Sequence, residues 1–317
     1  MEGNMSYYKF SGDYYSRDSK RKINYYIYEP KCEIVGVLQI SHGMCEYVEL
    51  YEDFISFMTK NGWLVCGNDH LGHGEAALER GELGYFTEGD GFRSCVEDMH
   101  TLRQIIAQKF GEYTYVLMGH SMGSFIARAY VTKFSKWLDG AVFSGTAYGN
   151  TKFLGTQLLM IDKYKFKDGD KAVADKLTES AFSAFNNRIE NPVSVRDWVS
   201  RDEKFVDKFD NDQLCNFSFT VNGFENLAKM KAYVSDERWY ESLNKELPLL
   251  LISGREDPVG RYGKGVYKLF EKLSAKDCNV RMKLYSGMRH QIFNEIGKEE
   301  VYSDVLGFCE NIRKDKK

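Results

Sequence analysis

The segment from residue 113 to residue 134 reads YTYVLMGHSMGSFIARAYVTKF: an apolar run, a Gly-His-Ser-Met-Gly turn centred on Ser121, and a helix-forming run. A G-x-S-x-G motif between a strand and a helix is typical of a sharp turn that holds its serine above the end of a sheet. The motif also occurs by chance, so the prediction depends on the strand before it and the helix after it. This segment therefore predicts an α/β fold in which Ser121 is a nucleophile.

Short apolar runs rich in β-branched and aromatic residues recur along the chain, as expected of strands that are buried on both faces. They alternate with helical patterns, which predicts right-handed crossovers and a doubly wound, mostly parallel sheet. In such a sheet the ligand crevice lies at the carboxyl ends of the strands. The predicted strands are residues 23–28, 35–41, 63–69, 113–118, 141–144, 249–253 and 280–285.

The strand-helix alternation stops at about residue 149 and resumes at about residue 247. The intervening stretch has helical patterns with many aromatic and charged residues, which predicts an inserted helical cap at 149–246. The core would then comprise 1–148 and 247–317. Several apolar residues of the insertion would line an apolar pocket or form the core of the cap itself: Phe153, Leu154, Leu158, Leu159, Met160, Phe182, Phe185, Phe217, Phe219 and Phe224.

A serine hydroxyl needs a base within hydrogen-bond reach to become a nucleophile. In proteins with this strand-turn-helix elbow, the chain order is serine, acid, histidine. Of the six histidines, only His290 lies beyond Ser121, just after the last predicted strand. We therefore expect His290 to be the base.

The third member should accept the Nδ1 proton of the histidine and stabilise the imidazolium. Residues 251–258 read LISGREDP, which places two carboxyl groups directly after a predicted strand. We predict that Asp257 is the acid and keep Glu256 as the second choice. The alternative role for Asp257 is to cap a helix that begins near Tyr262.

The tetrahedral intermediate of ester cleavage carries an oxyanion that needs preorganised N–H donors. One donor is expected to be the backbone N–H of Met122, the residue after the nucleophile. The other is expected to be the Met44 N–H, in the loop that follows predicted strand 35–41. Support for the elbow and this loop is expected from His42, Gly43, Gly119, His120 and Gly123.

Together these motifs resemble the monoglyceride lipase and lysophospholipase group of α/β-hydrolases. The matching segments are HGMCE at 42–46, DHLGHG at 69–74, GHSMG at 119–123, GREDP at 254–258 and RHQ at 289–291. The resemblance implies the α/β-hydrolase fold, a cap over an apolar acyl tunnel, and hydrolysis of monoacylglycerols, lysophospholipids or similar single-chain esters without a cofactor. The chain departs from the group's pattern at Tyr47, Ser124 and Gln291, where a histidine, a second glycine and an acid are usual.

Composition narrows the range of partners. The formal net charge of −3 and the lack of a basic block beyond the C-terminal tail indicate no nucleic-acid partner. No apolar run reaches the ~20 residues that span a bilayer, and the N-terminus does not resemble a secretory signal. Seven scattered cysteines favour reduced thiols and a cytoplasmic location. We expect a small-molecule ester as partner, with transient membrane contact through the cap; the sequence specifies no oligomeric state.

Three other functions are compatible with parts of the sequence: a metal site, an aminopeptidase and a ligand-binding protein without catalysis. Asp69, His70 and His73 offer metal-ligand types, but the glycine-rich family motif explains them without a metal. An aminopeptidase of the same fold would hold the substrate's amino group with acidic cap residues, for which the candidates are Glu179, Glu190, Asp197, Asp202 and Glu203. A silent ligand-binding hydrolase fold is disfavoured because Ser121, Asp257 and His290 are all present.

Overall fold

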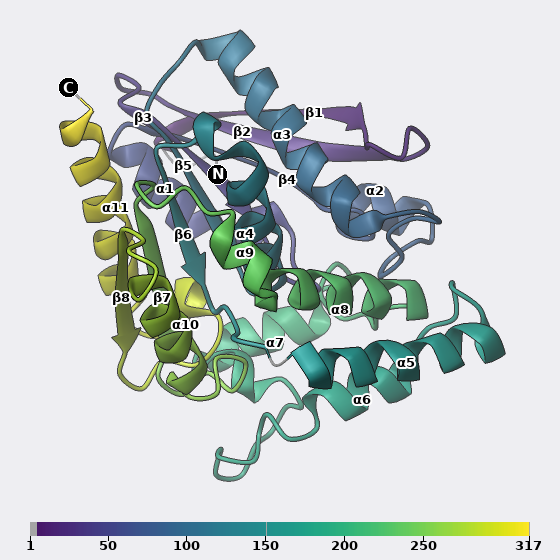
Figure 1. Ribbon diagram of the computed structural model, residues 1–317. Coiled ribbons are helices and arrows are strands. Elements are labelled where there is room, and N and C mark those ends of the chain that lie inside the picture. The colour runs from purple at the N-terminus through teal and green to yellow at the C-terminus, as the bar shows by residue number, and fades with distance from the viewer. Residues whose placement is uncertain (1–4, 150, 317) are drawn as a thin grey trace.

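The computed structural model describes residues 5–149 and 151–316, and Figure 1 shows a twisted sheet flanked by helices. Within these residues the sheet has eight strands in the order β1-β2-β4-β3-β5-β6-β7-β8. The strands β1 and β2, and β2 and β4, pair antiparallel, and every other neighbouring pair is parallel. The predicted α/β fold with a doubly wound, mostly parallel sheet is confirmed. The strands are β1 (Tyr7–Tyr15), β2 (Lys22–Pro30), β3 (Gly36–Ser41), β4 (Trp63–Asn68), β5 (Tyr115–His120), β6 (Gly140–Ser144), β7 (Leu249–Gly254) and β8 (Val280–Tyr285).

All seven predicted strands are present, and β1 is an eighth strand that the apolar pattern does not predict. Most of its side chains are exposed or half-buried, and it pairs only with β2 at the edge of the sheet. An antiparallel edge strand can keep polar residues on its outer side, so it lacks the apolar run of an inner strand. The inner strands β3, β4, β5, β6 and β7 are buried at every position.

Helices cover both faces of the sheet. On one face α1 packs against α11, and on the other α3 packs against α4. No helix in the described parts of the chain is both long and apolar enough to cross a bilayer. The helices are α1 (Glu52–Lys60), α2 (Gly74–Glu79), α3 (Gly91–Phe110), α4 (Met122–Phe134), α5 (Thr151–Asp168), α6 (Asp175–Phe182), α7 (Glu203–Asn211), α8 (Val221–Ser235), α9 (Glu237–Glu241), α10 (Lys264–Ser274) and α11 (Lys298–Asp315), with short 3₁₀ turns η1 (Val48–Tyr51), η2 (Ser135–Trp137), η3 (Asp197–Val199) and η4 (Ile292–Asn294).

The segment between β6 and β7 is helical. It contains α5 to α9, and among its described residues the β pairing is confined to one isolated bridge between Val173 and Thr220. Figure 1 shows α5 to α8 gathered at the side of the sheet toward which the arrowheads of β6 and β8 point. Catalytic side chains of parallel sheets lie at those carboxyl ends. The boundaries 149 and 246 stay a prediction.

A buried arginine joins α4 to this helical segment. Arg128 is fully buried, and none of the ion pairs among the described residues involves it. Its guanidinium instead donates to Ala147 O at 3.0 Å and to Val234 O at 2.6 Å, and its carbon Cζ lies 4.4 Å from the ring centroid of Trp239. Burial lowers its pKa to about 10. The guanidinium thus ties the loop after β6 and the end of α8 to the core.

We expect Arg128→Met to lower the free energy of unfolding by about 3 kcal/mol, because it leaves buried carbonyl oxygens without donors. Urea denaturation measures the change. The control is Arg93→Met, in which an exposed arginine of α3 is replaced and a change within about 0.5 kcal/mol is expected. Equal effects of the two substitutions would contradict this role for Arg128.

Candidate active site

The turn around Ser121 is strained and tightly packed. Ser121 follows β5 and precedes α4, with φ of 52° and ψ of −119°, a region that non-glycine residues rarely adopt. A Cβ atom at Gly119 would lie 2.4 Å from Gly123 O, and one at Gly123 would lie 2.1 Å from Ser41 O. Only glycine fits at either position, so the two glycines of the motif are required by packing.

The structure brings Ser121 and His290 together from distant parts of the chain. His290 lies in the loop after β8, and its Nε2 is 2.8 Å from Ser121 Oγ. Its Nδ1 is 3.0 Å from Asp257 Oδ1, although the N–H is poorly aligned with that oxygen for a hydrogen bond. Such contacts are often loose in enzymes without substrate and tighten when it binds. The three side chains predicted from chain order therefore form one continuous row.

Asp257, and not Glu256, is the carboxyl group that meets His290. Asp257 is fully buried, whereas Glu256 is exposed. Its carboxylate accepts the Ser253 O–H at 3.0 Å and the Val259 N–H at 2.8 Å. The side chain does not cap the next helix, because the N-cap of α10 is Gly263. These bonds hold the carboxylate in place after β7.

The two predicted oxyanion donors lie at the ends of neighbouring elements. Met122 is the first residue of α4, where a backbone N–H has no partner inside the helix. Within the part of the chain that the structure describes, the Met44 N–H also has no hydrogen-bond partner. The helix N-terminus adds a partial positive charge beside Ser121. Both amides are thus free to receive a ligand oxygen.

Glu46 holds the loop that carries Met44, a role that the residue pattern alone did not reveal. It is almost fully buried, and its Oε2 accepts the Gly43 N–H at 2.7 Å and the Tyr51 O–H at 2.6 Å. A Cβ atom at residue 43 would lie 2.9 Å from the same oxygen, which explains the glycine there. The signal was available in the H-G-x-x-E spacing, where the carboxylate reaches back to the N–H three residues earlier.

His120, the residue before Ser121, is fully buried beneath the site. Its Nδ1 lies 3.2 Å from Ser144 Oγ, and its ring centroid is 4.7 Å from that of His290. Burial, followed by the nearness of His290, lowers the pKa of His120 well below its usual value. The ring is therefore neutral and supports the elbow without adding a charge that would oppose the imidazolium of His290.

Three further histidines, His42, His70 and His73, pack together at the loop that carries Met44, which we call the oxyanion loop (residues 42–47). His42 Nε2 accepts the His70 N–H at 2.9 Å, and His73 Nε2 accepts the Cys45 N–H at 3.2 Å. Burial lowers the pKa of all three, to about 3 for His70 and about 4 for His73. Acceptor nitrogens cannot carry protons, so the loop conformation requires neutral His42 and His73.

The same contacts bear on the metal alternative. Asp69 accepts the Val48 N–H at 3.0 Å, while His73 Nδ1 is bonded to Leu71 O at 3.0 Å. Among the described residues, no three histidine, cysteine or acidic side chains are grouped so that they would hold a metal ion. The D-H-x-x-H residues of this loop are engaged in hydrogen bonds within the loop and to its neighbours.

We predict that His73 makes stability fall in acid. Its pKa is about 4 in the folded protein and ~6.5 when unfolded, so between these values only the unfolded chain binds the proton. Its contribution is complete above pH ~6.5 and falls by up to about 1.4 kcal/mol per pH unit below that. Urea denaturation of the wild type and of His73→Gln should give a difference that shrinks as pH falls from 7 to about 4.5. A difference that stays constant with pH would contradict the prediction.

Residues of the helical segment approach the site on two sides. The ring centroid of Trp198 lies 5.2 Å from that of His290, and Phe182 and Phe185 pack on Trp198. On the other side, Phe217 O lies 3.3 Å from Cys45 Sγ in the oxyanion loop. Of the other apolar candidates, Leu154, Phe219 and Phe224 are buried, Leu158 is half-buried, Leu159 and Met160 are exposed, and the side chain of Phe153 lies outside the described residues.

Backbone carbonyl groups of residues 197–200, at η3, accept hydrogen bonds from the loop that carries His290. The Gln291 N–H donates to Val199 O at 2.7 Å, and the guanidinium of Arg289 donates to Asp197 O at 2.7 Å and to Ser200 O at 3.0 Å. The position of the His290 ring therefore depends on η3 as well as on β8.

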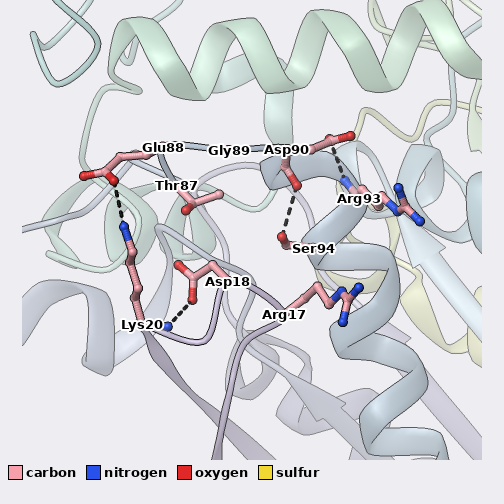
Figure 2. Close-up of a pocket in the computed structure, with 9 residues that line it drawn as sticks. All are labelled: Arg17, Asp18, Lys20, Thr87, Glu88, Gly89, Asp90, Arg93 and Ser94. Atoms are coloured by element: carbon pink, nitrogen blue, oxygen red, sulfur yellow. Dashed lines mark hydrogen bonds and ion pairs between the residues drawn. The ribbon is translucent and has the colours of Figure 1, made fainter.

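A separate cavity lies away from these residues. Figure 2 shows it between the β1–β2 turn and the start of α3, with a volume of about 350 Å³. Its lining is polar and charged, and Lys20 and Glu88 form an ion pair of 2.8 Å across its edge. None of Ser121, Asp257 and His290 lines it.

The sequence of this chain is similar to those of known proteins. A family model described as serine aminopeptidase, S33, matches residues 33–297. The chain belongs to this family. The S33-family chain is 25% identical over 290 residues to the monoacylglycerol lipase of Mycolicibacterium smegmatis, covering 90% of this chain and 92% of that protein. It is 26% identical to the monoglyceride lipase of Mus musculus, covering 86% of this chain and 80% of the mouse protein.

Among solved structures, this S33-family protein is similar to a thermostable carboxyl esterase from Bacillus coagulans in complex with glycerol. The identity is 29%, the TM-score is 0.90, and the match covers 96% of this chain and 99% of that chain. The resemblance to monoglyceride lipase-like α/β-hydrolases is confirmed. The family description refers to a peptidase, whereas these relatives are named as lipases and an esterase, so the geometry of the site has to separate the two activities.

Proposed function

We propose that this protein is a serine hydrolase that cleaves carboxylic esters of single-chain lipids, of the monoacylglycerol or lysophospholipid type, through an acyl-enzyme. The observation that carries the proposal is the 2.8 Å contact between His290 Nε2 and Ser121 Oγ at a strained elbow. A nucleophile bonded to a base, which in turn faces a buried carboxylate, is the arrangement that activates serine. The lipase and esterase relatives support the ester as substrate.

In the proposed mechanism His290 takes the proton of Ser121 as Oγ attacks the ester carbonyl. Asp257 stabilises the imidazolium that forms and keeps its Nδ1–H directed away from the serine. The N–H groups of Met44 and Met122 receive the oxyanion. His290 then passes the proton to the leaving alcohol, and a water molecule activated by the same imidazole releases the acid. These steps need no cofactor.

Aminopeptidase activity is less well supported, because the acidic candidates of the helical segment have other positions or partners. Glu179, Glu190 and Glu203 are exposed. Asp197 accepts the Val193 N–H at 2.7 Å, and Asp202 caps the first turn of α7. An ammonium group needs carboxylates that converge beside the scissile bond. The side chains that do approach His290 from this segment are Trp198 and its aromatic neighbours, which suit an apolar substrate.

We predict that ester hydrolysis depends on Ser121 and rises with acyl length. Purified protein would be assayed on p-nitrophenyl esters of increasing chain length and on an aminoacyl p-nitroanilide. Loss of the triad serine removes the attacking atom, so Ser121→Ala should lower kcat by about 10⁵-fold or more without changing the melting temperature. Faster cleavage of the anilide than of every ester would contradict the lipid-ester proposal and favour the peptidase.

We also propose that the helical segment 149–246 forms a cap that makes transient contact with membrane surfaces through α5. Leu159 is 66% exposed and Phe166 is 95% exposed. The spacing of Leu159, Lys163 and Phe166 places them on one face of the helix, and Lys163 and Lys167 are exposed as well. Exposed apolar residues mixed with lysines are typical of helices that lie on anionic bilayers.

Sedimentation with anionic phospholipid vesicles tests the membrane contact. The double variant Leu159→Ser and Phe166→Ser should bind at least about tenfold more weakly, since each apolar side chain buried contributes ~1.5–3 kcal/mol. Tyr267→Ser, which removes a half-exposed side chain of α10, serves as the control and should bind like the wild type. Equal binding by all three proteins would contradict a docking role for α5.

For localisation we propose the cytoplasm. All seven cysteines are free thiols, and all but Cys32 are buried. Free buried thiols are usual in reducing compartments, where disulfides are rare.

A further inference from the structure

Glu46 is surrounded by hydrogen-bond donors. Its Oε2 accepts from the Gly43 N–H and the Tyr51 O–H, and its Oε1 accepts from Gln291 Nε2 at 2.8 Å. His120 Nε2 lies 3.4 Å from Oε1. A backbone N–H and an amide NH₂ can only donate, so these neighbours need acceptor oxygens on Glu46. The network therefore favours the negatively charged form of Glu46 although the residue is buried.

The amide of Gln291 has its orientation set by the same network. Its Nε2 donates to Glu46 and, at 3.2 Å, to the oxygen of Tyr51, while its Oε1 has no partner among the described residues. Both donor contacts need the NH₂ group on this side. An acid at position 291 is usual in the group that this chain resembles. When ionised, such an acid would place an acceptor oxygen against Glu46; otherwise the two carboxyl groups would share one proton.

Glu46 and Gln291 join the two halves of the site. Glu46 bonds to Gly43, the residue before the proposed oxyanion donor Met44, and to Gln291, the residue after the proposed base His290. The chain separates these two loops by more than 240 residues, as the separation of 245 between the bonded partners shows. One buried carboxylate thus sets the distance between the oxyanion loop and the base.

We infer that Glu46 and Gln291 are a pair of positioning residues that holds the oxyanion loop in register with His290, and that an amide at position 291 keeps this pair at a single negative charge over the working pH range. The inference rests on the proposed function of Ser121, His290 and Met44, and it assigns Glu46 and Gln291 no contact with substrate.

The titratable groups around Glu46 come from several elements, and most of them are uncharged. The titratable groups that face it are Tyr51 from η1, His120 from the end of β5, His290 from the loop after β8, Cys45 of the oxyanion loop, and Cys215 from the segment after α7. Burial raises the pKa of Glu46, and its hydrogen bonds from Tyr51, Gly43 and Gln291 oppose that rise. Burial also keeps the tyrosine and the two thiols protonated.

Gln291→Glu is the decisive substitution because it changes an NH₂ group into an oxygen and little else. Two carboxyl groups in hydrogen-bond contact share one proton at low pH and repel each other when both ionise. While the proton is shared, the new acid still donates to Glu46 and the loops stay joined. Once it is lost, the loops separate and the oxyanion donor moves away from the base.

We therefore expect Gln291→Glu to give a bell-shaped pH profile of kcat on a short p-nitrophenyl ester. Wild-type kcat should stay level from about pH 7 to about pH 9, whereas the variant should fall by about tenfold or more over this range, since small misplacements of catalytic groups are costly. The melting temperature is measured at each pH to confirm that the variant remains folded. KM on this small substrate should change little, because neither residue is assigned to substrate binding.

The double variant Glu46→Gln with Gln291→Glu tests the pairing itself. The amide at position 46 accepts from Gly43 and Tyr51 with its oxygen and donates to the carboxylate at position 291 with its NH₂, so the three bonds of residue 46 are kept with one charge. Only the 3.2 Å contact between residue 291 and the Tyr51 oxygen is lost. The level profile should return. Gln104→Glu, the same chemical change on the exposed side of α3, is the control and should leave the wild-type profile unchanged.

The outcomes separate the inference from the function on which it rests. A wild-type enzyme that shows Ser121-dependent hydrolysis, together with a Gln291→Glu profile parallel to it, would contradict the positioning role alone. Failure of the double variant to restore the level profile would contradict the pairing. A wild type without Ser121-dependent ester hydrolysis would contradict the proposed function.

Discussion

At Gly123 the backbone of α4 lies directly against the end of β3, so close that a single added carbon would sit 2.1 Å from Ser41 O and 2.4 Å from His42 O. The rest of the site depends on this approach. It places the start of α4, and with it the Met122 N–H, beside the loop that carries Met44. The same turn holds Ser121 at a positive φ of 52°, whose cost of about 1–3 kcal/mol the packing of the elbow has to offset.

Most of the polar side chains buried under this contact are uncharged, and they are held in place by hydrogen bonds to their neighbours. His42, His70, His73 and His120 all have pKa values lowered by burial and serve as neutral hydrogen-bond partners. Glu46 and Asp257 are buried carboxyl groups, and both accept several hydrogen bonds. In the proposed mechanism this arrangement confines the change in charge to His290, the group that takes up and releases the proton.

The helical segment between β6 and β7 participates in the site through its backbone as much as through its side chains. Carbonyl groups at η3 accept hydrogen bonds from the loop of His290, while Arg128 donates a hydrogen bond that joins the end of α8 to the core. The ring of Trp198 packs on that of His290, whereas Leu159 and Phe166 of α5 point outward into solvent. The proposed membrane contact and catalysis would thus use different faces of the same segment.

The sequence by itself determined the buried parallel strands, the elbow at Ser121 and the chain order that points to His290 and to an acid directly after β7, because these depend on local periodicity, on glycine spacing and on counting. It did not reveal β1, since an edge strand carries no apolar run. Only the tertiary structure decided between Asp257 and Glu256, through their burial. Only it disclosed the link from Glu46 to Gln291 and the place of Trp198 over His290, because such contacts join residues far apart in the chain and depend on where the packed loops come to lie.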